Sequence, residues 1–160
     1  MKIRQTTERD IPIVRVMESS VESRSWVYQW SVEQHREAVQ DSDAGHWILE
    51  NELGIIVGYC IMKGLTNPYG VVELMRIVIE PKGEGYGSRA MAAVMEKVFL
   101  ELKARRLWLD VVNENHIAIQ VYEKLGFVYE GTLRESALIE GKPVSMRLYG
   151  MLDREWKPSV

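Results

Sequence analysis

Residues 82–87 are Lys-Gly-Glu-Gly-Tyr-Gly, and they join a predicted strand to a predicted helix. The strand, residues 71–79, is rich in β-branched side chains, and the helix, residues 88–104, carries apolar side chains at helical spacing. Glycines let the backbone turn tightly and approach a ligand closely. The free amides at a helix start suit a pyrophosphate. A glycine-rich turn without a ligand is the alternative for this loop taken alone.

The loop fits neither of two common nucleotide-binding patterns. A Walker A loop requires Lys-Ser or Lys-Thr after its last glycine, and neither pair follows Gly87. Gly83, Gly85 and Gly87 are two residues apart and therefore miss the G-x-G-x-x-G spacing of dinucleotide-binding folds. A nucleotide-binding domain is thus disfavoured.

Residues 115–127 form a second segment whose residues suit ligand binding or catalysis. Asn115 can cap a short helix or accept a hydrogen bond from a ligand. Ala118 leaves space on the helix face that carries Tyr122 one turn later, which makes a slot with a proton donor at its end. The alternative is a packed helix with a half-buried tyrosine. Gly126 stands where a left-handed C-terminal cap is expected.

Hydrophobic periodicity over the whole chain predicts an α+β fold in a single domain, residues 1–160. We expect a mostly antiparallel sheet of about seven strands, flanked by about four helices. The predicted strands are residues 3–6, 46–50, 55–63, 71–79, 107–112, 127–133 and 144–152, and the predicted helices are residues 10–20, 31–41, 88–104 and 117–125.

Composition excludes several classes of protein. Twenty basic and 23 acidic residues give a net charge of −3, which argues against a nucleic-acid binder. No apolar run approaches the ~20 residues of a membrane span, and the N-terminus lacks a signal peptide. The single cysteine, Cys60, cannot form an internal disulfide, so we expect a cytoplasmic protein. The three histidines lack metal-ligand spacing, so no metal site is predicted.

The two segments together resemble the GNAT superfamily of N-acetyltransferases. The family's coenzyme loop, Arg/Gln-x-x-Gly-x-Gly/Ala, matches residues 82–87, with Lys82 as a departure at the first position. Its later signature, Asn-x-x-Ala-x-x-x-Tyr-x-x-x-Gly-Phe, is complete at Asn115, Ala118, Tyr122, Gly126 and Phe127. Residues 73–79 and 154–156 look most like the branch that holds ribosomal-protein and spermidine acetyltransferases.

The resemblance implies that acetyl-CoA is the co-substrate. In this family the coenzyme's pantetheine arm lies between two splayed parallel strands, here residues 71–79 and 107–112. Backbone groups of Ile77, Val78 and Ile79 would bind the arm and polarise the thioester carbonyl. Asn115 would touch the arm or support the tyrosine, and Ala118 would leave room beside it. The pyrophosphate would rest on the loop residues Gly83, Glu84, Gly85, Tyr86, Gly87 and Ser88.

The resemblance also implies direct acetyl transfer to a primary amine, in a small molecule, a polyamine or a protein N-terminus. Tyr122 is the candidate acid for the leaving thiolate, and Glu73 is the candidate base, acting through water. Glu73 could instead lie at a solvated strand end or pair with Arg76, and Asp110 is a second candidate base. The competing function is a non-catalytic acyl-CoA-binding module with the same fold.

Three alternating aromatic residues, Trp26, Tyr28 and Trp30, lie where the family builds its acceptor pocket. They could stack on the substrate or cover a cationic amine. Core packing or a contact in a homodimer is the alternative. The acceptor itself is left open by the sequence.

Overall fold

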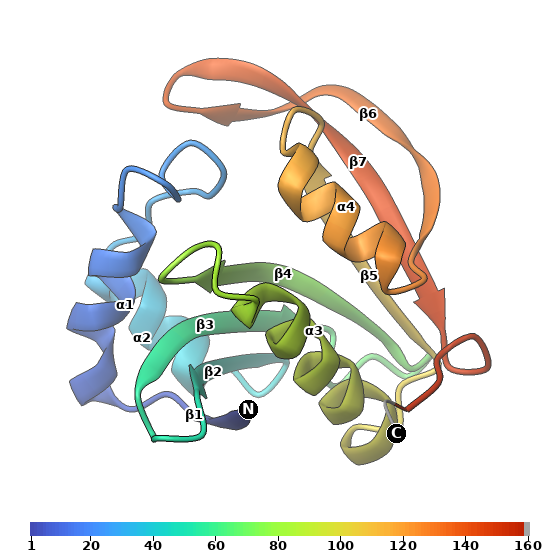
Figure 1. Ribbon diagram of the computed structural model, residues 1–160, viewed down its shortest axis with the longest axis horizontal. Coiled ribbons are helices and arrows are strands. Elements are labelled where there is room, and N and C mark those ends of the chain that lie inside the picture. The colour runs from blue at the N-terminus through green and yellow to red at the C-terminus, as the bar shows by residue number, and fades with distance from the viewer. Residues whose placement is uncertain (159–160) are drawn as a thin grey trace.

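The computed structural model describes residues 1–158 and contains one seven-stranded sheet with helices on both faces (Figure 1). The strand order is β1-β2-β3-β4-β5-β7-β6, and only the β4–β5 pair is parallel among these residues. In chain order the elements are β1 (Lys2–Gln5), α1 (Ile11–Glu18), α2 (Val32–Gln40), β2 (Ala44–Glu50), β3 (Ile56–Lys63), β4 (Val71–Ile79), α3 (Tyr86–Glu96), β5 (Arg106–Val112), α4 (His116–Lys124), β6 (Val128–Ile139) and β7 (Lys142–Leu152). The predicted α+β fold is confirmed.

Each face of the sheet has its own apolar core. Because side chains alternate along a strand, neighbouring residues of β2 enter different cores. Leu49 packs with Val94 of α3 in the larger core, which also includes residues of α4, β5 and β7. Ile48 packs with Val14 of α1 in the smaller core on the opposite face. The sheet therefore separates α3 and α4 from α1.

The parallel pair opens shortly after it begins, which confirms the predicted splay. β4 and β5 are paired only from Val71 with Arg106 to Glu73 with Trp108. The Gly70 carbonyl holds the start of the pair by accepting hydrogen bonds from the amides of Arg105 and Arg106. Beyond that point β4 stays paired with β3, and β5 with β7, so the sheet divides into two halves (Figure 1).

A β-bulge interrupts β4 within the splayed region. Arg76 lies opposite Ile61 and Leu74 lies opposite Met62, so Met75 is an extra residue in β4. Met75 packs against the α1 core, and the Arg76 side chain bonds to Glu18 of α1 on the same face. The extra residue therefore shifts the alternation of side chains in the rest of the strand.

Most predicted boundaries differ from the observed ones by one or two residues, and those of α3 and β6 have local causes. The predicted helix 88–104 ends in a π-helical turn, Lys97–Glu101. Helix α3 begins at Tyr86, two residues before the predicted start, because Gly85 adopts a left-handed conformation and serves as the N-cap. Strand β6 continues to Ile139 through two irregularities in its pairing with β7. The tight turn at Glu140 and Gly141, both with positive φ, supports this long hairpin.

No helix within residues 1–158 has both the length and the apolar character needed to cross a bilayer.

Candidate active site

The loop between β4 and α3 keeps its backbone accessible. Gly83 and Gly85 have φ values of 81° and 74°, a region that favours glycine. A Cβ atom placed at Gly83, Gly85 or Gly87 would meet no other atom within 4 Å. Gly87 has no positive φ and no close neighbour, so neither the fold nor packing requires glycine there. An open approach to the backbone suits the predicted pyrophosphate site.

The amides in the first turn of α3 have no acceptor within their own helix. Gly85, the N-cap, has no side chain that could accept from them. The Tyr86 ring lies to one side, under the Arg89 guanidinium at 4.5 Å, and its hydroxyl accepts from Asn51 at 3.4 Å. Side chains therefore leave this helix start available to an anionic ligand.

The predicted coenzyme loop is hydrogen-bonded to the segment between α1 and α2. Glu80 accepts hydrogen bonds from the hydroxyls of Ser20 at 2.7 Å and Ser23 at 2.9 Å. The Lys82 ammonium donates to the Ser23 hydroxyl at 3.2 Å, and burial lowers the pKa of Lys82. Lys82 thus directs its charge toward Ser23 and toward Glu80, whose carboxylate lies 3.8 Å from the ammonium.

Helix α4 places the later signature beside β5. The Asn115 side-chain oxygen accepts from the Ala118 amide at 3.2 Å, so Asn115 acts as the helix cap. The Tyr122 ring packs against Phe127 and Tyr149, with ring centroids 5.9 and 6.4 Å apart. These contacts fix the phenol in one position.

The Tyr122 hydroxyl itself makes no hydrogen bond to any residue from 1 to 158, although only 7% of the residue is exposed. Within residues 1–158, every side-chain nitrogen or oxygen that is shielded from solvent has a hydrogen-bond partner. Because the Tyr122 hydroxyl has none, it must be in contact with solvent. Burial and the charge of Asp110 raise the pKa of Tyr122 well above its usual range. The phenol therefore remains protonated at neutral pH and can act as a proton donor.

Two carboxylates and an indole share the sheet face opposite α3 and α4. Glu73 of β4 is in register with Trp108 of β5, and Asp110 follows two residues later on the same face. Burial raises the pKa of Glu73 and of Asp110, and the charge of Asp110 raises the pKa of Glu73 further. Among residues 1–158 neither carboxylate forms an ion pair. This arrangement provides acceptors for a cation.

Arg76, which the sequence left as a possible partner for Glu73, pairs with Glu18. Glu73 is half-buried beside the splay. The pairing alternative is therefore wrong, and the candidate base has no neutralising arginine.

Sequence reasoning missed Trp108 and Glu18. Trp108 alternates with the buried Leu107 and Leu109, so the period of two already placed it on the face of Asp110. Glu18 lies seven residues after Ile11 on the apolar side of α1 and is buried. An acid on the apolar face of an amphipathic helix was the available signal.

The three aromatic residues of the segment between α1 and α2 have different surroundings. Trp26 and Tyr28 are 37% and 47% exposed. Trp30 is half-buried, with the Arg76 guanidinium 4.5 Å from its ring centroid. Arg24, in the same segment, reaches Glu140 at the β6–β7 turn at 3.7 Å, so the two segments approach each other near the splay (Figure 1).

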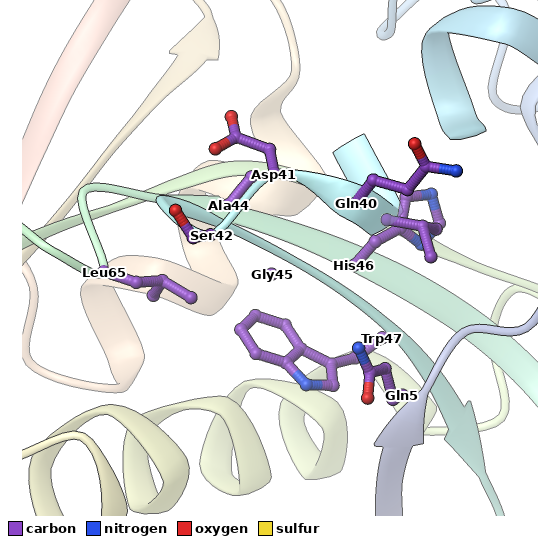
Figure 2. Close-up of a pocket in the computed structure, with 10 residues that line it drawn as sticks. Gln5, Gln40, Asp41, Ser42, Ala44, Gly45, His46, Trp47 and Leu65 are labelled. Carbon is purple, nitrogen blue, oxygen red and sulfur yellow. The ribbon is translucent and has the colours of Figure 1, made fainter. Parts of the chain in front are cut away.

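A separate hollow of about 370 Å³ lies at the other side of the sheet, beside β2. Figure 2 shows the Trp47 indole in it below Gly45, with Gln5, Ser42 and Leu65 around it. None of the predicted coenzyme or catalytic residues lines this hollow. β3 separates β2 from β4, so the hollow is distinct from the candidate active site.

Residues 1–158 contain no group of three or more His, Cys, Asp or Glu side chains placed to hold a metal ion. The Cys60 thiol is fully buried, and burial raises its pKa to about 12. Cys60 is therefore a core residue and lacks the thiolate that a nucleophile needs.

The family model described as acetyltransferase (GNAT) family matches residues 14–127. The chain belongs to this family. Spermidine N(1)-acetyltransferase of Escherichia coli (strain K12) is 39% identical over 69 residues, which cover 42% of this GNAT chain and 37% of that enzyme. An uncharacterized prophage N-acetyltransferase of Bacillus subtilis (strain 168), YokL, is 28% identical over 93% of the chain and 80% of the relative.

Solved structures show the same fold. Spermidine N-acetyltransferase from Vibrio cholerae in complex with CoA and spermine superimposes with a TM-score of 0.86, at 20% identity, over 96% of both chains. The predicted family and the GNAT fold are confirmed. Because the match spans little more than a third of the E. coli enzyme, the activity, the co-substrate and the acceptor of this chain are proposals.

Proposed function

We propose that this GNAT-family chain acetylates an aliphatic polyamine. The observation that carries the acceptor class is the face formed by Glu73, Trp108 and Asp110, whose two carboxylates form no ion pair within residues 1–158. The charge of Lys63, opposite Glu73 in β3, lowers the pKa of Glu73, but burial and Asp110 outweigh it. A polyamine carries several ammonium groups, so one can lose its proton and react while another stays near a carboxylate. An indole attracts cations through its face. Relatives from E. coli, V. cholerae and B. subtilis named as spermidine or spermine acetyltransferases support the same class.

In this proposal the splayed strands receive the coenzyme. The backbone of Ile77, Val78 and Ile79, at the diverging end of β4, binds the pantetheine arm and polarises the thioester carbonyl. The amides of residues 83–88 hold the pyrophosphate. Ala118 leaves room on α4, and Asn115, whose oxygen caps the helix, offers its side-chain nitrogen to the arm.

Side chains on both sides of the splay then serve the transfer. Glu73 accepts the proton of the attacking ammonium through water, and its raised pKa brings it closer to the pH at which a base works best. The new bond joins the amine nitrogen to the carbonyl carbon, and the bond from that carbon to sulfur breaks. Tyr122 gives its proton to the leaving sulfur. Asp110 is the second candidate for the base.

Two experiments test this proposal. The first measures the melting temperature with different ligands, and the second measures acetyl transfer to a series of acceptor amines. Acetyl-CoA should raise the melting temperature by several degrees, whereas ATP and NAD should not, because only a ligand of the native state stabilises it. Release of CoA thiol is then measured with spermidine, spermine, butylamine, an aminoglycoside and a short peptide. We expect kcat/KM for spermidine to exceed that for butylamine by at least about tenfold.

Three outcomes would contradict parts of the proposal. Stabilisation by acetyl-CoA without transfer to any amine would favour the non-catalytic binding module. Equal rates with spermidine and butylamine would remove the role of the two carboxylates in choosing a polycation. Preference for the peptide would move the acceptor to a protein N-terminus.

The cytoplasmic location and the homodimer remain predictions. The buried free thiol of Cys60 supports a reducing compartment. Cell fractionation and sedimentation velocity test the two predictions separately.

A further inference from the structure

One buried carboxylate of α1 is hydrogen-bonded to α2, β3, β4 and the segment before α2, on the α1 side of the sheet. Glu18, the last residue of α1, is 1% exposed and accepts four hydrogen bonds. The donors are the Tyr59 hydroxyl of β3 at 2.8 Å, the Trp30 amide before α2 at 2.9 Å, the His35 ring of α2 at 3.4 Å, and the Arg76 guanidinium of β4. Both carboxylate oxygens are therefore fully used.

Two hydrogen-bonded histidines connect the same carboxylate to Thr6. His35 contacts His46 at 3.0 Å between ring nitrogens, and His46 contacts the Thr6 hydroxyl at 2.8 Å. An ionised carboxylate only accepts, so the His35 Nε2 donates to Glu18. The other His35 nitrogen shares a hydrogen bond with His46, whose second nitrogen shares one with the Thr6 hydroxyl. Burial would raise the pKa of Glu18, but the bond from His35 and the charge of Arg76 bring it below its ordinary value.

Arg76 connects this cluster to the bulge of β4. Its side chain points to Glu18 because the extra residue, Met75, shifts the alternation of the strand. Arg76 is 5% exposed, and its guanidinium lies 4.5 Å from the centroid of the Trp30 ring. Ile77, the first residue whose backbone is proposed to bind the acetyl arm, follows directly.

Glu18 also holds the aromatic segment that precedes α2. Its carboxylate accepts from the Trp30 amide, and its own carbonyl accepts from the Gln29 side chain at 2.8 Å. Trp26 and Tyr28 lie only a few residues earlier. The same residue therefore fixes one segment proposed for the acceptor and one strand proposed for the coenzyme.

We propose that Glu18 and Arg76 are positioning residues of the transfer reaction, whose buried ion pair fixes the β4 bulge and the aromatic segment relative to each other. The proposal rests on the proposed function, because it assigns the acetyl arm to β4 and the acceptor to residues 26–30. Neither side chain needs to touch a substrate. A displacement of about 1 Å between reacting groups can cost about a hundredfold in rate.

Three variants test the pair in steady-state kinetics and calorimetry. We expect Glu18→Gln to lower kcat by about 10- to 100-fold and to raise the KM for the acceptor. Acetyl-CoA affinity should fall less than kcat, because the pyrophosphate loop is unaltered and only the contacts of the arm with residues 77–79 are disturbed. Arg76→Lys keeps the charge but cannot both pair with Glu18 and cover Trp30, so its kcat should be intermediate. The double variant Glu18→Gln/Arg76→Lys should lose no more than the worse of the two single variants, since both changes break one interaction.

Tyr59→Phe is the matched control. It removes a hydrogen bond to the same carboxylate and lowers stability, but it leaves the Glu18–Arg76 pair intact. Its kcat should stay within a few fold of the wild type. A loss of kcat in Tyr59→Phe equal to that in Glu18→Gln would show that the cluster only stabilises the fold and would overturn the proposal.

Hydrogen exchange without any ligand separates this inference from the proposed function and remains informative if Glu18→Gln fails to fold. In Arg76→Lys the amides of residues 26–30 and of residues 76–79 should both exchange faster than in Tyr59→Phe. Acceleration in only one segment would refute the coupling. If the wild type acetylates no amine, the proposed function fails, while the exchange data still decide whether the pair couples the two segments.

Discussion

Tyr122 carries the one proton that the leaving sulfur needs in the proposed reaction. Tyr122→Phe keeps the ring contacts with Phe127 and Tyr149 and removes only the hydroxyl. We expect turnover to fall by about 10²–10⁴-fold, the usual contribution of general acid–base catalysis. Acetyl-CoA affinity, measured by calorimetry, should change much less.

Tyr149→Phe is the control for this substitution. The Tyr149 hydroxyl donates to Glu123 at 2.8 Å, and its ring neighbours that of Tyr122. Turnover of this variant should stay close to that of the wild type. Similar losses in both variants would make Tyr122 a packing residue.

Glu73 must be ionised to accept a proton, and burial together with Asp110 raises its pKa above the ordinary value of 4.5. The acid limb of the kcat/KM profile should therefore lie above the usual range for glutamate. Glu73→Gln should remove that limb and lower kcat/KM most near neutral pH. Raising the pH should restore part of the rate, because the acceptor amine, with a pKa of ~10, then loses its proton to solvent.

The pH–rate profile of Asp110→Asn is measured alongside. If Glu73→Gln keeps the wild-type profile and Asp110→Asn loses the acid limb, Asp110 is the base. If both variants keep the acid limb, bulk water takes the proton.

The start of α3 offers a test in which stability and affinity move in opposite directions. Gly87 lies in the first helical turn, where an added Cβ meets nothing within 4 Å. Gly87→Ala should therefore stabilise the fold by up to about 1 kcal/mol, since alanine favours helix over glycine. The same methyl group should weaken acetyl-CoA binding, and Gly87→Val should weaken it more. Urea unfolding and calorimetry measure the two effects, and unchanged affinity in both variants would place the pyrophosphate elsewhere.

Global stability should depend on the buried histidine pair in mildly acidic solution. Burial, then the charges of His35 and Arg76, lower the pKa of His46 from 6.5 to about 4, against weaker opposing effects of Glu18 and Asp10. The folded state thus favours neutral His46. Its contribution is complete above pH 6.5 and falls as the pH decreases toward 4. A shift of this size corresponds to about 3 kcal/mol over that window.

Urea unfolding at pH 7.5 and pH 5 measures this dependence. The wild type should lose about 2 kcal/mol between the two pH values from this residue. His46→Gln should lose less, because it has no proton to take up. His116→Gln, at an exposed position, should keep the wild-type slope, and equal slopes in all three proteins would contradict the assignment.

Capping and turn residues, which act locally in the chain, determined where most helices and strands begin and end. The pair Ser31 and Gln34 predicted the start of α2, and the structure contains both hydrogen bonds of that capping box. Gly126, with a φ of 92°, ends α4 as expected. Such signals act within a few residues of one another, so a sequence displays them directly.

The sequence by itself also determined the family, because its two motifs lie within short segments and only Lys82 departs from them. Only the tertiary structure decided where β4 bulges and which partner Arg76 takes. The bulge depends on pairing with β3, and the partner, Glu18, lies 58 residues away in the chain. The nearness of Glu73 to Asp110 likewise follows from the register of β4 with β5. Contacts between distant segments depend on the packing of the whole sheet, and no local pattern encodes them.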